Sequence, residues 1–143
     1  YPGNEHHLEK LNTLIDKLNL KENIIITGEI NDIKTVYASL DISIMSSAEP
    51  EPFGGVTLES MAFSKPVIGT NIGGTPEQII DDVTGILVAP NNSFEMGKAI
   101  LKLINDPDLR KKMGYMGRKR FEEEFGFEPY YNKIVSHYKI LTK

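Results

Sequence analysis

The chain alternates short apolar runs with longer amphipathic stretches. Apolar residues recur every three or four positions from Leu8 to Leu18, which predicts a helix that ends near Asn19. The β-branched run Ile24–Thr27 follows and predicts a short buried strand that Gly28 stops. Residues 33–40 then return to helical spacing. The first quarter of the chain therefore predicts a helix, a strand and a second helix.

The same alternation continues along the middle of the chain. A capping box of Thr75 and Gln78, with Pro76 at the first helical position, predicts one helix start, and Ser93 is expected to cap another. Gly69 is expected to end the strand Pro66–Ile68. Strands are predicted at Ile42–Met45, Pro66–Ile68 and Ile86–Val88, and helices from near Val56 to Ala62, from Thr75, and from Ser93 to Asn105.

From Pro107 onward only helix is predicted. The first segment runs to Glu124 and breaks at Phe125–Phe127, and the last helix, residues 128–143, carries one apolar stripe. The stripe consists of Tyr131, Ile134, Val135, Tyr138 and Leu141. Short strands alternating with helices predict an α/β fold, a Rossmann-like parallel sheet with helices on both faces. In such sheets ligands bind beyond the carboxyl ends of the strands.

Composition narrows the class of protein. The 143 residues, 40% of them hydrophobic, suffice for one globular domain. Cysteine is absent, which excludes disulfides, thiolate metal sites and cysteine nucleophiles. A net charge of −4 with scattered lysines argues against nucleic acid as a partner. No apolar run approaches the roughly 20 residues that span a bilayer, so we expect a cytoplasmic protein.

The loop after the predicted strand Ile42–Met45 carries the candidate chemistry. It contains two adjacent glycines, Gly54 and Gly55, which allow a ligand to approach the backbone at the start of a helix. Glu51 precedes the glycines and Glu59 follows them, so two carboxylates bracket a site for an anion. Carboxylates accept hydrogen bonds from hydroxyls. The expected ligand is therefore a sugar–diphosphate–ribose, with hydroxyls at both ends and negative charge in the middle.

The segment Glu51-Pro-Phe-Gly-Gly-Val-Thr-Leu-Glu59 resembles the donor-site motif of glycosyltransferase family 4, whose members are retaining enzymes of the GT-B fold. Further blocks resemble the same family in order. They are Met61-Ala62, Lys65–Ile68, Gly73–Glu77 and Thr84–Val88. The resemblance implies transfer of a glycosyl group, such as a hexosyl unit, from a nucleoside-diphosphate sugar, with retention, without a metal ion or other cofactor, in polysaccharide biosynthesis.

The resemblance also implies a role for each residue of the motif. Glu51, in the catalytic centre, would hydrogen-bond hydroxyls of the transferred sugar, and Glu59 would hydrogen-bond the ribose. Glu49 repeats the Glu-Pro element, but the family spacing selects Glu51. The N–H groups of Phe53, Gly54 and Gly55 would contact sugar and diphosphate, Val56 and Thr57 would lie near phosphate and ribose, and Gly28, Glu29 and Ile30 would lie against the nucleobase.

The chain resembles only the C-terminal, donor-binding half of such an enzyme. It begins without Met, at what resembles the loop after the second strand of that domain, so we expect a fragment that is incomplete at its N-terminus and inactive alone. An Arg and a Lys that neutralise the diphosphate, and the N-terminal acceptor domain, would then lie outside it. We expect that domain to supply any peripheral contact with the inner face of the membrane, and the fragment to complete its sheet by rearrangement, strand exchange or dimerisation.

Plainer interpretations stay open for these residues. Glu51 and Glu59 could be N-terminal charges that stabilise a helix dipole by about 0.3–1 kcal/mol. Gly73 and Gly74 could shape a turn or line the donor pocket. Two other functions also fit the pattern, a non-hydrolysing sugar-nucleotide epimerase and a non-catalytic nucleotide-sugar-binding module.

Overall fold

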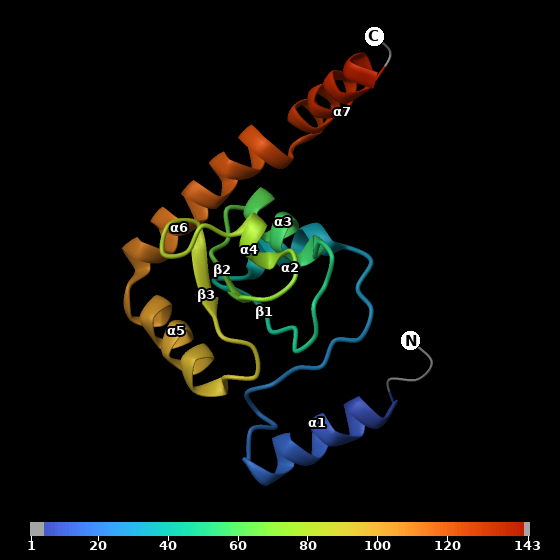
Figure 1. The fold of residues 1–143 in the computed structure, drawn as a ribbon. Coiled ribbons are helices and arrows are strands. Elements are labelled where there is room, and N and C mark those ends of the chain that lie inside the picture. Colours follow the sequence, from blue (N-terminus) through green and yellow to red (C-terminus); the bar gives the residue numbers. More distant parts are fainter. Residues whose placement is uncertain (1–4, 142–143) are drawn as a thin grey trace. The chain divides into compact units, whose positions relative to one another are not determined.

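A computed structural model describes residues 5–141 and divides the chain into two compact units, residues 1–33 and 34–143. The first unit contains one helix and the second contains a three-stranded sheet with its helices (Figure 1). The elements are α1 (Glu5–Lys17), α2 (Ile33–Ser39), β1 (Ser43–Met45), α3 (Gly55–Ala62), β2 (Val67–Thr70), α4 (Thr75–Gln78), β3 (Gly85–Val88), α5 (Ser93–Asn105), α6 (Pro107–Arg120), η1 (Phe121–Phe125) and α7 (Phe127–Leu141).

The sheet has the order β1-β2-β3, and both pairs of strands are parallel. Ile68 of β2 pairs with Ile44 of β1 on one side and with Ile86 of β3 on the other. Parallel neighbours need a crossover, which α3 supplies between β1 and β2 and α4 supplies between β2 and β3. The predicted Rossmann-like α/β fold is confirmed.

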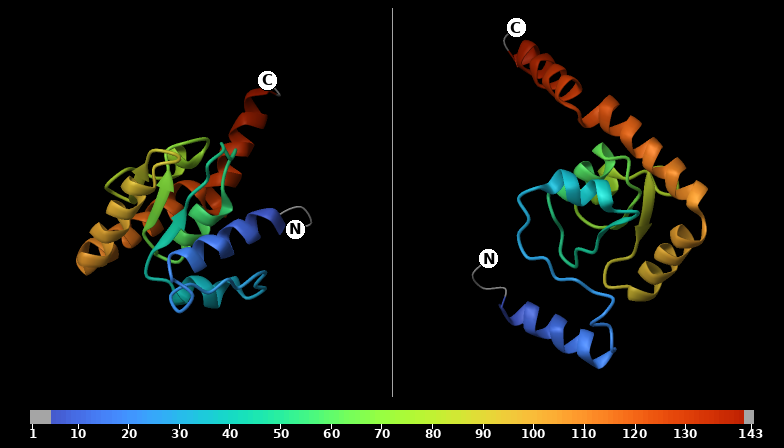
Figure 2. Two further views of the ribbon diagram at one scale, coloured as in Figure 1. Left: turned by 90° about the horizontal axis from the view of Figure 1, so that it is seen from below. Right: turned by 180° about the vertical axis from the view of Figure 1, so that it is seen from behind.

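Helices cover both faces of the sheet (Figure 2). Successive residues of a strand point to opposite faces, so Val67 and Ile68 of β2 lead into two different cores. Ile68 packs with residues of α5 and α6, whereas Val67 packs with Met61 of α3 and with Ile79. The side chains of Val67 and Ile68 are both fully buried, as expected for the central strand of a sheet that is covered on both faces.

The predicted strand Ile24–Thr27 is wrong. The residues form coil, and the side chain of Ile25 is 86% exposed. A β-strand exists only where a neighbour accepts and donates its backbone hydrogen bonds, and among the described residues nothing pairs with this segment. The predicted helix before it is correct as α1, after which Asn19 adopts a left-handed conformation with φ 54°.

Three predicted boundaries in the second unit also need correction. Gly69 lies inside β2 rather than closing it. Thr75 is the first residue of α4, after an N-cap Gly74 that makes no side-chain cap, so the capping box does not form. The side chain of Asn92, rather than that of Ser93, caps α5 by accepting from the Glu95 N–H. In each of these three cases the helix or strand begins or ends within one residue of the position that the sequence predicts.

The helical C-terminal part contains a wider turn. The α-helical hydrogen bonds of α6 end at Arg120, and residues 121–125 continue as one π-helical turn that closes with a bond from the Gly126 N–H to the Phe121 carbonyl. The break predicted at Phe125–Phe127 is therefore confirmed, with Gly126 between two helices. In α7 the side chains of Tyr131 and Tyr138 are exposed. Among the helices between residues 5 and 141, none has the length and apolar content needed to cross a bilayer.

Candidate functional site

Residues 46–54, which we term the glutamate loop, connect the carboxyl end of β1 to α3. Three hydrogen bonds shape it. The Ser47 hydroxyl donates to the Glu51 carboxylate, the Thr70 hydroxyl donates to the Ser47 carbonyl at 2.9 Å, and the Gly74 N–H donates to the Glu51 carbonyl at 2.9 Å. The carboxyl ends of β1 and β2 thus converge on this loop, as the fold class predicts.

The two glutamates flank the adjacent glycines, as the sequence predicts. The Glu51 Oε2 atom lies 3.3 Å from where a Cβ on Gly54 would stand, and the Glu59 Oε1 atom lies 3.4 Å from the corresponding position on Gly55. Glu51 is exposed and Glu59 is half-buried. Each carboxylate therefore lies beside one of the two glycines at the start of α3.

The two glycines are not equivalent. A Cβ on Gly54 would come within 2.2 Å of the Met45 Cε atom, so the buried Met45 side chain would have to shift to make room for it. A Cβ on Gly55 would meet only the Glu59 carboxylate. Internal packing explains the glycine at position 54, whereas position 55 opens onto free space beside the carboxylate.

The start of α3 offers free backbone N–H groups. Its N-cap, Gly54, makes no side-chain cap, and the first N–H groups of a helix have no partner within the helix. Val56 is 41% exposed, but Thr57 is fully buried and its hydroxyl donates to the Met45 sulfur at 3.1 Å. Of Thr57, therefore, only the backbone is placed to face a ligand.

Glu59 lies in the second turn of α3, and the first turn carries no acidic residue. The helix dipole acts on charges only within the terminal turn. A role limited to stabilising the dipole therefore explains Glu59 poorly. Its carboxylate instead reaches back along the helix to the side of Gly55.

Gly73 and Gly74 form the support under the glutamate loop. Gly73 has φ +60°, and a Cβ on it would stand 2.4 Å from the Glu51 carbonyl oxygen. A Cβ on Gly74 would stand 2.1 Å from the Pro52 carbonyl oxygen. These contacts favour the structural interpretation of this pair, because the two backbones touch directly.

Tyr37 of α2 contributes to the site, although the sequence indicated only a buried helix position. Its ring stacks on Phe63 with centroids 5.6 Å apart. Burial first, and then a hydrogen bond to the Glu59 carboxylate, raise the pKa of Tyr37 to about 12. The phenol therefore remains protonated at neutral pH and holds the Glu59 carboxylate by donating to it.

Replacing Tyr37 with Phe should flatten the alkaline part of the stability profile. The folded pKa of about 12 exceeds the ordinary value of 10.0, so the proton-linked stability is complete below pH 10 and is lost as the pH rises towards 12. We expect the free energy of unfolding of the wild-type chain to fall more steeply over this range than that of Tyr37→Phe. Urea denaturation at several pH values measures both slopes. The exposed Tyr115, replaced in the same way, should keep the wild-type slope; equal slopes for all three proteins would contradict the assignment.

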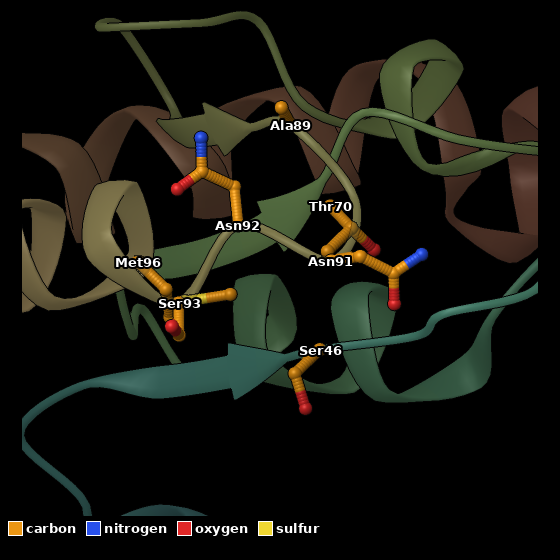
Figure 3. A pocket seen from close by; sticks show the side chains of 7 residues that line it. All are labelled: Ser46, Thr70, Ala89, Asn91, Asn92, Ser93 and Met96. Atoms are coloured by element: carbon orange, nitrogen blue, oxygen red, sulfur yellow. The ribbon is translucent and has the colours of Figure 1, made fainter.

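A separate cavity of about 270 Å³ opens beyond the carboxyl ends of the strands (Figure 3). Its lining combines hydroxyl and amide side chains from three strand ends and from the start of α5. The residues are Ser46, Thr70, Ala89, Asn91, Asn92, Ser93 and Met96. It carries no charged side chain, and Glu51 and Glu59 do not line it. Its chemistry suits neutral hydroxyl groups, whereas an anion is better served by the start of α3.

One other expectation concerns residues of the first unit. Gly28, Glu29 and Ile30 belong to the first unit, so their assignment to a nucleobase stays a prediction. Gly28 has φ +65°, a conformation that suits a tight loop. Within residues 5–141 no three His, Asp or Glu side chains gather as metal ligands.

The fold agrees with comparisons to known proteins. The sequence matches the family "Glycosyl transferases group 1" over residues 2–120, and the chain belongs to this family. It is 32% identical to N-acetyl-alpha-D-glucosaminyl L-malate synthase of Bacillus anthracis over 90% of the chain and 32% of that protein. It is 30% identical to the capsular polysaccharide biosynthesis glycosyltransferase CapM of Staphylococcus aureus over 85% of the chain and 32% of that protein.

Solved structures show the same fold. The crystal structure of Anabaena Alr3699/HepE in complex with UDP superposes with a TM-score of 0.93 at 26% identity, over 97% of this chain and 38% of that one. The same protein in complex with UDP-glucose gives a TM-score of 0.90. The chain thus spans about a third of the length of the curated relatives that it matches.

Proposed function

We propose that the chain is the donor-binding half of a retaining glycosyltransferase of family 4, which transfers a glycosyl unit from a nucleoside-diphosphate sugar to an acceptor without a metal ion. Membership of the glycosyl transferases group 1 supports the reaction class. The UDP and UDP-glucose complexes of Alr3699/HepE support the ligand class, because that protein shares this fold. The acceptor-binding domain, the remaining cations and any membrane contact would lie elsewhere in the full-length protein, which we propose acts in the cytoplasm in polysaccharide biosynthesis.

The observation that carries this proposal is the start of α3, which has no side-chain cap and has a carboxylate beside each of its two glycines. Free N–H groups there can bind the diphosphate, and they stabilise the charge that grows on its leaving oxygen as the bond to the sugar breaks. Glu51 then accepts hydrogen bonds from sugar hydroxyls and Glu59 accepts them from ribose hydroxyls. In this arrangement Glu51 positions the sugar and does not act as a nucleophile.

The family membership favours transfer over the alternative of a sugar-nucleotide epimerase. A non-catalytic nucleotide-sugar-binding module would share the same donor contacts. Turnover separates these two functions, since only the transferase converts donor and acceptor into a glycosylated product.

The role of Glu59 is tested by Glu59→Gln in the full-length protein. A ribose ligand loses a charge-assisted hydrogen bond, so affinity for a nucleoside diphosphate should fall about 10- to 100-fold. Affinity for the 2′,3′-dideoxy analogue, which lacks the hydroxyls, should already be weak in the wild type and should not fall further. Calorimetric titration with both nucleotides measures the difference.

The exposed Glu123, replaced with Gln, removes one carboxylate from the helical C-terminal part and serves as the control. Its affinity for both nucleotides should match the wild type. Equal weakening of both nucleotides by Glu59→Gln, or of neither, would exclude Glu59 as the ribose ligand and leave an anion site at α3.

A further inference from the structure

Gln78, the last residue of α4, is a fully buried polar side chain against the glutamate loop. Its Nε2 donates to the Gly54 carbonyl oxygen at 3.1 Å. Its Oε1 is also buried and finds no hydrogen-bond partner among the described residues. An unpaired buried acceptor destabilises a fold, so an apolar side chain of the same length would suit this core better. The amide is explained by what it does to Gly54.

The Gly54 carbonyl and the Gly55 N–H belong to one trans peptide group. The two bonds of a trans peptide are coplanar and point in opposite directions. A hydrogen bond from Gln78 to the Gly54 oxygen therefore helps to fix the direction of the Gly55 N–H at the open start of α3. It also polarises the peptide group and strengthens that N–H as a donor.

The Arg120 side chain hydrogen-bonds the backbone of Gln78. Its Nε donates to the Gln78 carbonyl at 2.9 Å and its Nη2 donates to the Glu77 carbonyl at 2.8 Å. α4 has only four residues, so these terminal carbonyls have no partner further along the helix. Nη1 pairs with the Glu124 carboxylate at 2.6 Å, and the Arg120 side chain is only 17% exposed. The fork of the guanidinium thus joins α4 to the end of α6.

The π-helical turn extends this connection to the glutamate loop. The Arg120 guanidinium lies 5.2 Å from the Phe125 ring centroid, and the Phe125 ring lies 5.9 Å from that of Phe53. A π-turn places residues five positions apart one turn from each other, which brings Arg120 and Phe125 to the same side. The loop is therefore contacted at Gly54 through Gln78 and at Phe53 through Phe125.

We propose that Gln78 is a positioning residue for the donor diphosphate, and that Arg120 fixes Gln78 in place. Gln78 aims the Gly55 N–H at the diphosphate, and Arg120 and Phe125 prevent α4 and the loop from moving apart. This inference rests on the proposed function of α3 as the diphosphate site. It predicts that affinity for the donor depends on an amide group that the fold does not need.

The test is Gln78→Met in the full-length protein, because Met keeps the length of the side chain and removes both polar atoms. The melting temperature should stay the same or rise. The Kd for whichever of ADP, GDP and UDP binds the wild type best should increase about three- to tenfold. Arg120→Lys, which keeps the charge and loses the fork, should increase the Kd in the same direction. Lys119→Gln removes a charge from the same turn without a contact to α4 and should bind like the wild type.

Each outcome decides the proposal. A lower melting temperature with an unchanged Kd for Gln78→Met would make Gln78 a packing residue and overturn it. An unchanged Kd together with an unchanged melting temperature would overturn it as well, while the binding of nucleotide by the wild type would leave the proposed function in place. A wild-type protein that binds none of the three nucleoside diphosphates would overturn both.

Discussion

Gly55→Val should abolish donor binding in the full-length protein and leave the fold intact. A Cβ at this position meets only the Glu59 carboxylate at 3.4 Å, so the domain has room for the larger residue. Valine also has a higher helix propensity than glycine at the start of α3. Its methyl groups would occupy the space through which an anion reaches the first N–H groups of the helix. We expect the Kd for the nucleoside diphosphate to rise at least about 100-fold, which corresponds to about 2.7 kcal/mol.

Gly97→Val is a matched control for this experiment. Gly97 lies in α5, and a Cβ on it would meet no heavy atom within 4 Å. Calorimetric titration and thermal unfolding of both variants separate binding from folding. If Gly55→Val unfolds the protein while Gly97→Val does not, the glycine is structural and the anion site loses its main support. Gly54→Val is unsuitable here because its Cβ would collide with Met45.

Glu51→Gln should lower turnover far more than it weakens binding of the bare nucleotide. The amide keeps the size of the side chain, and its oxygen can still accept from the Ser47 hydroxyl, so the glutamate loop should keep its shape. The lost charge matters for the sugar hydroxyls alone. We expect kcat to fall about 10- to 100-fold, which matches the loss of one charge-assisted hydrogen bond, with the Kd for the nucleoside diphosphate unchanged.

Glu49→Gln tests the same substitution two positions earlier. Glu49 is exposed and also precedes a proline, so it is matched in chemistry and in local sequence. Steady-state kinetics with a donor and acceptor should give wild-type values for it. Equal losses of turnover and of nucleotide affinity in Glu51→Gln would mean that Glu51 contacts the nucleotide rather than the sugar.

The elements of the sheet could be predicted because they depend on local pattern. β1, β2 and β3 are short apolar runs between helices, and each lies within a residue or two of its predicted place. The segment Ile24–Thr27 has an equally strong pattern, yet it is coil in the structure. Pairing is a property of two segments, so one segment cannot specify it alone.

The candidate site also has one part that local sequence reveals and another that it does not. Glu51, the glycines and Glu59 are contiguous in sequence, and a motif can therefore reveal them. Their supports come from distant parts of the chain. Gln78 lies 24 positions from Gly54, and Arg120 lies 42 positions from Gln78. In the sequence, Arg120 is one of three consecutive basic residues, and nothing local shows that its guanidinium turns inward.

The exposed coil at Ile24–Thr27 has a practical consequence for recombinant work. Three consecutive exposed isoleucines, which pair with no strand among the described residues, form the kind of β-prone segment that associates between molecules. Expression of residues 1–143 alone would therefore favour inclusion bodies. A shorter clone that starts at Lys34 would omit the segment and retain both cores and the glutamate loop. Such a clone is the better starting point for crystallisation and for NMR.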